Sequence, residues 1–270
     1  MPLANVLTCE FIGLQTLKEV WAVRLRVDFH TGARQLPWDS VLAPGRALAY
    51  GLLERGAPEL GARLHTKGWG PHGMVPFGHG APVFPAARSR RGVYAADGPG
   101  IVELGSPLLA VVEGWAKALA GMPVLAWGET AFIVDRVEPV EAPEFPSGRA
   151  VFRTVTPVVT KAVLERDASG ARVPGSVWRL PGEPEWDVYV QNNLRRKAES
   201  LGLDPGVTLE SVRWVGRKRS FAVASASGGG GKKPGACVEV TVSGPPETLS
   251  AIADWGLGQA NAAGMGWIGA

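Results

Sequence analysis

Four histidines are the side chains of this 270-residue sequence that titrate near neutral pH and could move a proton in a reaction. They are His30, His65, His72 and His79. His65 has the best-defined surroundings, because Lys67-Gly68 is typical of a helix end and would place His65 in the last turn. The negative end of the helix dipole favours a protonated imidazole there, which suits a general acid. The structural alternative is a helix-end histidine that packs over the core.

The sequence does not predict a metal centre. His65, His72 and His79 are evenly spaced, but the glycines and prolines between them keep the three from sharing one helical face. There is neither a His-Glu-x-x-His motif nor a pair of neighbouring cysteines, since Cys9 and Cys237 lie far apart. We therefore expect no metal, no cofactor and no disulfide framework. His72 and His79 are expected to be surface histidines of a loop, where either could contact a ligand or replace His65.

A glycine-rich stretch at residues 256–266 contains two Gly-x-Gly doublets around a small, polar centre. Glycine tolerates positive φ angles, and successive backbone N–H groups in such a loop can form an anion-binding nest. A P-loop would need Gly-Lys-Ser/Thr, and a dinucleotide fingerprint would need a βαβ unit that the four following residues cannot supply. Apolar residues interleave with the glycines, which is unusual for a disordered tail. We expect an ordered loop that packs onto a domain and donates backbone hydrogen bonds to a phosphodiester.

Lysine and arginine clusters are the other candidates for anion binding, and the formal net charge is +3. The clusters are Arg88, Arg90 and Arg91; Arg195, Arg196 and Lys197; Arg217, Lys218 and Arg219; and Lys232 and Lys233. The cluster at 217–219 is our first choice, because it lies on a predicted strand beside a flexible loop that contains two lysines. The structural alternative for each cluster is a solvated surface, which a mild positive charge equally allows.

The elements of the first half must position His65. Period-two alternation predicts a strand over 21–29, and a helical pattern over 46–67 should break at Pro58. Strands are also expected near 75–77, over 91–96 and within 124–137. A helix over 106–119 would have Ser106 as its N-cap and Pro107 as its first residue. This β-α-β-β-α-β order is the ferredoxin-like unit.

The second half repeats the order less clearly. A Pro- and Glu-rich stretch at 139–148 predicts the boundary between an N-terminal domain (1–140) and a C-terminal domain (150–270). Strands are expected over 153–164, 208–224 and 236–243, helices over 184–201 and 245–255, and a flexible hairpin loop over 225–235. Residues 1–18 show no clear pattern. The predicted fold is α+β, with two tandem ferredoxin-like domains and a C-terminal glycine-rich loop.

The two glycine doublets and their spacing resemble the glycine-rich loop of the CRISPR repeat-RNA processing endoribonucleases, which belong to the RAMP superfamily. Three further stretches are similar to this family: the helical segment of 49–53 and 63–68, which ends in Leu-His; the Thr-Pro strand of 155–159; and the helix of 186–197. The resemblance covers nearly the whole chain from about residue 21. It implies two ferredoxin-like domains, and CRISPR repeat RNA as the partner. It leaves open other subunits of a CRISPR complex and a homodimer.

The resemblance implies metal-independent RNA cleavage, in which the 2′-hydroxyl attacks the adjacent phosphodiester and leaves a 2′,3′-cyclic phosphate and a 5′-hydroxyl. It implies that His65 is catalytic and that Tyr50 orients the nucleophile or binds the phosphate, while Lys67 could stabilise the developing charge. The structural alternatives are an amphipathic core tyrosine and a lysine that complements the helix dipole. The implied RNA-binding residues are Gly256, Gly258, Gln259, Asn261, Gly264 and Gly266, together with Arg217, Lys218 and Arg219.

The composition, 46% hydrophobic and 20% charged, is typical of a soluble globular protein. No apolar run reaches transmembrane length and no signal peptide is evident, so we expect a cytoplasmic protein without membrane contact. Two alternatives to the endoribonuclease remain. One is a non-cleaving, RNA-binding subunit of a CRISPR effector complex, and the other is a small-molecule enzyme with a ferredoxin-like fold, for which the sequence has no cofactor motif.

Overall fold

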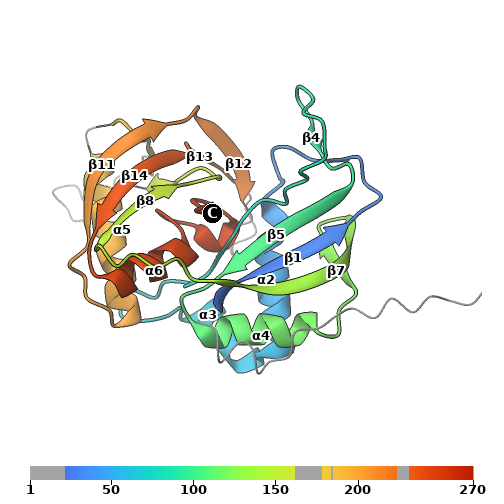
Figure 1. The fold of residues 1–270 in the computed structure, drawn as a ribbon, viewed down its shortest axis with the longest axis horizontal. Coiled ribbons are helices and arrows are strands. Elements are labelled where there is room, and N and C mark those ends of the chain that lie inside the picture. The colour runs from blue at the N-terminus through green and yellow to red at the C-terminus, as the bar shows by residue number, and fades with distance from the viewer. Residues whose placement is uncertain (1–21, 162–177, 184, 224–230, 270) are drawn as a thin grey trace, which may run out of the picture.

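The structure is a computed structural model that describes residues 22–161, 178–183, 185–223 and 231–269. These residues form two lobes, each with an antiparallel sheet and packed helices (Figure 1). The N-terminal lobe lies on the right in Figure 1 and the C-terminal lobe on the left. The stretch at 1–18, which shows no sequence pattern, lies outside the described residues.

The N-terminal lobe is built on a five-stranded antiparallel sheet in the order β3-β5-β1-β7-β6. Its strands are β1 (Ala22–His30), β3 (Gly78–His79), β5 (Pro99–Gly105), β6 (Val124–Trp127) and β7 (Thr130–Glu141), and its helices are α2 (Ala43–Gly56), α3 (Pro58–Thr66) and α4 (Leu109–Leu119). In the central strand β1, the alternating residues Leu25, Val27 and Phe29 are buried. The order of elements and strands is that of the ferredoxin-like unit, with β6 added at one edge.

Proline and glycine residues determine where α2 ends, where α3 begins and how closely α2 packs on α4. Pro58 opens α3, so the helical pattern breaks after Gly56 as the sequence predicts. Gly56 also lets α2 contact α4, because a Cβ there would lie 1.8 Å from the carbonyl oxygen of Gly114. Across the described ranges, no helix is long and apolar enough to span a bilayer.

The C-terminal lobe contains a three-stranded antiparallel sheet in the order β11-β14-β8. Its elements are β8 (Arg149–Arg153), α5 (Trp186–Leu201), β11 (Thr208–Val215), β14 (Val238–Ser243), α6 (Pro246–Trp255) and the 3-10 helix η1 (Asn261–Ala263). An antiparallel bridge between Thr154 and Ile268 places the residues after the glycine-rich loop next to β8. This is the position of the fourth strand in a ferredoxin-like unit, so the topology is consistent with a second such unit.

Three two-stranded pairs lie outside the two main sheets. They are β2 (Gln35–Leu36) with β4 (Tyr94–Ala95), β9 (Thr160–Lys161) with β10 (Trp178–Arg179), and β12 (Arg219–Val223) with β13 (Gly231–Gly235). The β12–β13 hairpin belongs to the C-terminal half of the chain, but Phe221 is buried in the hydrophobic core of the N-terminal lobe. The hairpin therefore connects the two lobes, and β12 lies between them in Figure 1.

Several predicted elements differ from the structure. The strand expected near 75–77 begins at Gly78, and the one expected over 91–96 is only β4, outside the main sheet. The main sheet uses β5 instead, whose glycines at 100 and 105 make its period-two pattern too weak to predict. Ser106 does not cap α4, because its hydroxyl donates to the Pro76 carbonyl oxygen at 2.5 Å and accepts from the Leu108 N–H at 3.0 Å.

In the C-terminal half, the strand predicted over 208–224 is split into β11 and β12 by residues 216–218. The loop predicted over 225–235 is partly wrong, since 231–235 form β13; residues 225–230 lie outside the described residues. The hairpin is ordered there because each residue from Arg219 to Val223 has a partner in β13.

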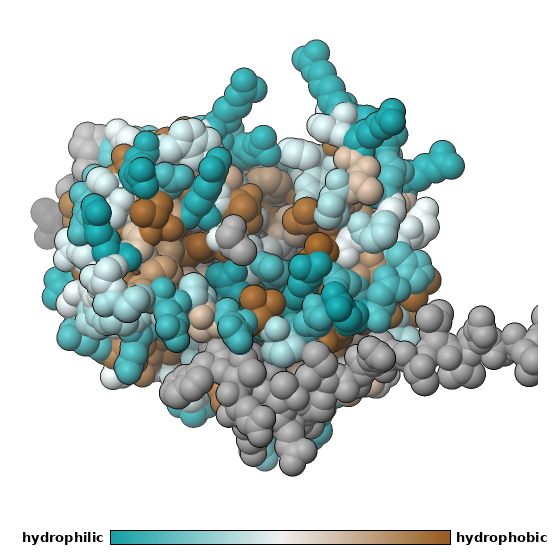
Figure 2. Space-filling view, in the orientation of Figure 1, coloured by the Kyte–Doolittle hydropathy of each residue, from teal (hydrophilic) through white to brown (hydrophobic). Residues whose placement is uncertain are grey.

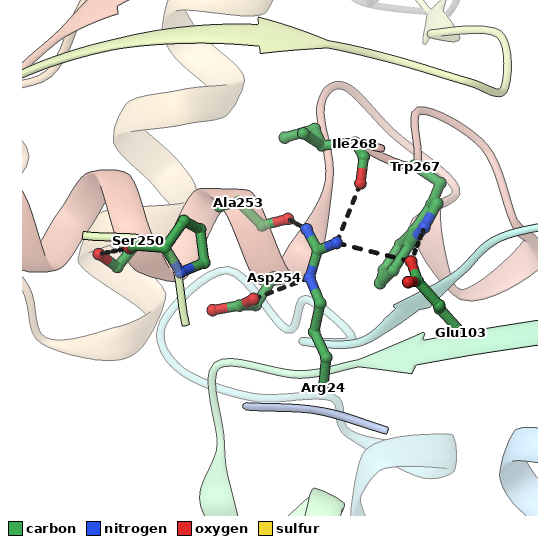
Figure 3. A network of polar contacts seen from close by, with 8 residues as sticks. Arg24, Glu103, Ser250, Ala253, Asp254, Trp267 and Ile268 are labelled. Atoms are coloured by element: carbon green, nitrogen blue, oxygen red, sulfur yellow. Dashed lines mark hydrogen bonds and ion pairs between the residues drawn. The ribbon is translucent and has the colours of Figure 1, made fainter. Parts of the chain in front are cut away.

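Arg24 of β1 joins the two lobes through a buried network (Figure 3). Its guanidinium donates to the Asp254 carboxylate at 2.9 Å, the Ala253 carbonyl oxygen at 2.5 Å and the Ile268 carbonyl oxygen at 3.1 Å. It also lies over the Trp267 ring, 4.4 Å from the centroid. Burial raises the pKa of the Asp254 carboxyl to about 7, and the charge of Arg24 opposes this shift. The network fixes the position of α6 and the chain end against the N-terminal sheet.

The face seen in Figure 2 is hollowed between the lobes, with hydrophobic residues in the hollow and long hydrophilic side chains projecting along its upper edge. Among the exposed apolar residues of the C-terminal half are Val151 in β8 and Val155 just after it, which are 50% and 57% exposed. A surface of this kind, apolar within and polar at its rim, is typical of a binding surface.

Candidate functional site

Tyr50 and His65 meet at the junction of α2 and α3. Their rings are 5.1 Å apart between centroids and nearly perpendicular, at 79°. His65 is exposed in the last turn of α3, where the sequence predicts it. The Tyr50 hydroxyl is buried and has no hydrogen-bond partner within the described ranges. Burial raises the pKa of the Tyr50 phenol, and the charge of Arg46 opposes this shift.

Arg46 lies beside this pair, and its charge and that of Lys161 act on Lys233. Arg46 lies one helical turn before Tyr50, and its guanidinium carbon is 5.3 Å from the centroid of the Tyr50 ring. Burial lowers the pKa of the Lys233 ammonium, and the like charges of Arg46 and Lys161 lower it further. In the part of the chain that the structure describes, no carboxylate forms an ion pair with any of the three. The three come from α2, β9 and β13, so their charges act on one another only where both lobes meet.

The glycine-rich loop is buried between the lobes rather than open to solvent. Ala262, Ala263 and Met265 belong to the hydrophobic core of the N-terminal lobe, whereas Leu257 and Ile268 belong to that of the C-terminal lobe. Gly256, Gly258, Gly264 and Gly266 all have positive φ angles, between 65° and 100°, which explains the two doublets.

Most backbone N–H groups of this loop already donate to protein oxygens. Gly266 donates to Pro157 and Gln259 donates to Val159, both at 2.9 Å, so the Thr-Pro segment after β8 holds the loop. The backbone N–H groups that were expected to bind a phosphodiester are therefore largely occupied by hydrogen bonds within the fold. Gln259 is the half-buried candidate at the edge of the loop, and its side-chain oxygen accepts from the Lys161 N–H at 3.3 Å.

His79 is fully buried in β3, so the prediction of a surface histidine is wrong. Its ring lies between α2 and the glycine-rich loop, since a Cβ at Gly45 or Gly264 would come within 2.2 Å or 2.6 Å of it. His79 Nδ1 donates to the Gly80 carbonyl oxygen at 2.9 Å, and burial lowers the pKa of the imidazole to about 4. The neutral ring fills the space between α2 and the glycine-rich loop, and any side chain at position 45 or 264 would clash with it.

Lys197 is also buried, so it does not belong to a surface cluster with Arg195 and Arg196. Its ammonium donates to the Gly256 carbonyl oxygen and, at 2.8 Å, to the Asn261 side-chain oxygen. The Asn261 amide donates in turn to the carbonyl oxygens of Leu257 and Met265. Asn261 therefore closes the loop internally, and Lys197 links it to α5.

The other predicted residues are exposed and separate. Arg217 and Lys218 lie in the turn between β11 and β12 rather than on one strand, and Arg219 begins β12, 5.2 Å from the centroid of the Trp38 ring. Arg88, Arg90 and Arg91 lie in the exposed loop before β4. Lys67 follows α3 as its C-cap residue. The His72 Nε2 is 2.5 Å from a carboxylate oxygen of Glu199, and the His30 Nδ1 is 2.7 Å from one of Asp135.

Comparisons with known proteins place this geometry in context. Residues 140–269 match the family model described as CRISPR associated protein Cas6, C-terminal. This part of the chain is similar to the C-terminal part of Cas6. The resemblance to CRISPR-associated RAMP proteins that the sequence indicates is thereby confirmed. A comparison of the sequence with curated proteins finds no match.

Most of the chain is similar in fold to solved structures of Cas6 and related RAMP proteins. A RAMP protein that binds different RNA substrates is 15% identical with a TM-score of 0.74, over 91% of this chain and 98% of that one. A CRISPR associated protein Cas6 is 17% identical with a TM-score of 0.70, over 92% and 98%. A Cas6-related protein from Pyrococcus furiosus is 12% identical with a TM-score of 0.72, again over 92% and 98%. At these identities the likeness establishes the fold, so the predicted α+β class is confirmed.

Sequence reasoning did not select Arg46 or Lys161 as candidate site residues. Arg46 could have been found from its position four residues before Tyr50 on one helix. No local signal marks Lys161, because its proximity to Lys233 depends on how β9 and the β12–β13 hairpin pack.

Proposed function

We propose that this protein is a metal-independent endoribonuclease that cleaves CRISPR repeat RNA. The contact between Tyr50 and His65 carries the proposal, because it sets an exposed imidazole against the ring of a tyrosine whose hydroxyl has no partner in the described ranges and whose ring Arg46 also contacts. The match of residues 140–269 to the Cas6 C-terminal family model supports it, as does the similarity in fold to a RAMP protein that binds RNA.

In this reaction the 2′-oxygen of one nucleotide attacks the adjacent phosphorus, so that an O2′–P bond forms and the P–O5′ bond breaks. The proton of the 2′-hydroxyl passes to water, and the departing 5′-oxygen receives a proton from His65. The role assigned to Tyr50 is to orient the 2′-hydroxyl through its phenol group. The cations stabilise the additional charge on the phosphorane in the transition state. The products are a 2′,3′-cyclic phosphate and a 5′-hydroxyl.

The test is cleavage of the host repeat RNA in EDTA, with His65→Ala compared with wild type. Removing a general acid should slow single-turnover cleavage about 10²–10⁴-fold. His72→Ala is the control, since His72 is an exposed histidine that faces Glu199, and it should cleave at the wild-type rate. Product ends should resist 3′-end ligation and accept a 5′-phosphate from a kinase.

Normal cleavage by His65→Ala would remove the catalytic assignment. Tight binding without cleavage by the wild type would instead indicate the non-cleaving, RNA-binding subunit.

A further inference from the structure

We propose that the groove between α6 and the segment that joins the two lobes binds a small organic cation, an amine or guanidine with an apolar body. The volume of this groove is about 520 Å³, which is within the range of small-molecule sites. Neither Tyr50 nor His65 lines it. The inference therefore goes beyond the proposed function and does not depend on it.

Both lobes and the chain between them build this groove. Pro107 lines it from the N-terminal lobe, just before α4, and Leu203 lines it from the C-terminal lobe, just after α5. Residues 142–146, which follow β7, form another wall. The Ser250 hydroxyl of α6 donates to the Pro143 carbonyl oxygen at 2.7 Å and ties this wall to the helix. A molecule in the groove therefore contacts both lobes at once.

The walls of the groove are largely apolar and are held in place by the fold. Pro143, Phe145, Leu203 and Ala251 all line it. The Phe145 ring packs against the C-terminal core, edge to face with Phe152 at 5.5 Å between centroids. Such walls favour a ligand with an apolar body, because burying that body removes apolar surface from water.

The charged groups at the groove are all acidic. Glu144, Glu247 and Asp254 line it, and no lysine, arginine or histidine does so in the part of the chain that the structure describes. Carboxylates without a lysine or arginine among them favour a cation. The described residues contain no group of three or more potential metal ligands. The lining therefore suits an organic cation rather than a metal ion.

Asp254 provides the buried anchor. Its side chain is 1% exposed, and one carboxylate oxygen accepts from the Arg24 guanidinium at 2.9 Å. The other oxygen has no hydrogen-bond partner within the described ranges, and in Figure 3 it points away from Arg24, toward Ser250. A buried carboxylate oxygen with unused capacity to accept a hydrogen bond is the group that would orient an ammonium or guanidinium in an apolar groove.

The experiment is a calorimetric titration of the full chain with phenethylamine, and with 2-phenylethanol as a neutral compound of similar shape. Replacement of Asp254 is avoided, because it would leave Arg24 buried without its carboxylate. The double variant Glu144→Gln, Glu247→Gln instead removes two exposed charges from the groove. Its matched control is Glu54→Gln, Glu129→Gln, which removes two exposed glutamates that do not line the groove.

A second pair of variants tests the location of the site. Ala251→Trp fills the groove, because Ala251 is half-buried and lines it. Ala118→Trp is the matched control, since Ala118 is a half-buried alanine of α4 that does not line the groove. We expect Ala251→Trp to abolish amine binding and Ala118→Trp to retain it.

The wild type should bind the amine about 10–100-fold more tightly than the alcohol, because the ammonium donates to a carboxylate. The double variant in the groove should bind the amine about 2–10-fold more weakly, and its control should bind it as the wild type does. The amine should also raise the unfolding temperature of the wild type, since a ligand that binds only the folded chain stabilises it.

The pH dependence of binding tests the role of Asp254. The groups that face its carboxylate are Arg24, with Glu103 beyond it at 3.8 Å, and Glu144 and Glu247 across the groove. Burial raises the pKa of the Asp254 carboxyl to about 7, and the charge of Arg24 opposes this shift. Binding of the amine requires the ionised form, so it should release about half a proton at pH 7 and tighten as the pH rises from about 6 to 8. The dependence of the binding heat on the ionisation enthalpy of the buffer measures this release.

The absence of amine binding at about 1 mM, the weaker end of ordinary small-molecule affinities, would overturn the proposal. Equal affinity for the amine and the alcohol, or unchanged amine affinity in both the double variant and Ala251→Trp, would also overturn it. These outcomes are distinct from failure of the proposed nuclease, because the titrations contain no RNA.

Discussion

The two lobes meet at two clusters of charged side chains, and the clusters differ in how their charges are satisfied. Arg24 is buried with a carboxylate, two carbonyl oxygens and an aromatic ring around its guanidinium. Arg46, Lys161 and Lys233 have like charges as neighbours. Charged side chains therefore have two different roles where the lobes meet. A satisfied charge fixes geometry, whereas an unsatisfied cluster remains available to a ligand.

From this comparison we expect the largest change in stability when Arg24 is replaced. Arg24→Met should lower the free energy of unfolding by about 3–5 kcal/mol, because it leaves Asp254 buried without its partner. Arg26→Met is the control on the same strand, since Arg26 pairs with Asp28 at the surface and should cost less than about 1 kcal/mol. Urea unfolding of both variants measures this. Equal losses of unfolding free energy in the two variants would show that burial of the Arg24 network does not contribute to stability.

A smaller effect should appear as a dependence of stability on pH at His79. Its pKa is about 4 in the folded protein and ordinarily 6.5, so the unfolded chain binds a proton first as the pH falls. His79 therefore stabilises the fold fully above pH 6.5, and this contribution is lost as the pH falls through 4. The loss should be about 3 kcal/mol.

Comparing wild type with His79→Gln isolates this contribution. Asp254 acts in the opposite direction, because its raised pKa costs stability as the pH rises through about 7. Both proteins retain Asp254, so the difference between their urea-unfolding profiles at pH 4–7 reports His79 alone. Parallel profiles would contradict a neutral, buried His79.

The smallest effect concerns two partly buried tyrosines. The Tyr94 hydroxyl donates to the Pro82 carbonyl oxygen at 2.5 Å, whereas the Tyr50 hydroxyl has no partner in the described ranges. Tyr94→Phe should therefore cost about 1 kcal/mol, and Tyr50→Phe should be neutral or slightly stabilising. Chemical unfolding measures both, and cleavage should fall for Tyr50→Phe alone. If Tyr50→Phe were the less stable variant, its hydroxyl would have a structural partner.

The sequence predicted the features that depend on local pattern. The break at Pro58, the position of His65 in the last turn of α3, and the order of elements in the N-terminal lobe all follow from periodicity and helix-end residues. Features set by packing between distant segments could not be predicted. The residues around His79 have the composition of a surface loop, yet the His79 ring fills the space between Gly45 and Gly264, which come from opposite lobes.

The location of charged side chains was equally hard to predict from the sequence. Lys197 follows two exposed arginines in sequence, but helical geometry turns it inward to the glycine-rich loop. Arg46 and Lys161 join Lys233 only through the packing of α2, β9 and the β12–β13 hairpin. One-dimensional clustering of lysine and arginine therefore grouped the buried Lys197 with exposed arginines and did not select Arg46 or Lys161.

The network around Arg24 also affects the order in which the chain can assemble. Its hydrogen bonds join residues separated by 229, 230 and 244 positions, among the most distant in the chain. During synthesis the N-terminal sheet can pair long before residue 268 is made, so Arg24 remains hydrated until the C-terminal residues arrive. Docking of the lobes then becomes the last event of folding, governed by closure of a very long loop. The two lobes should therefore appear as a kinetic intermediate whose arginine is still accessible to solvent.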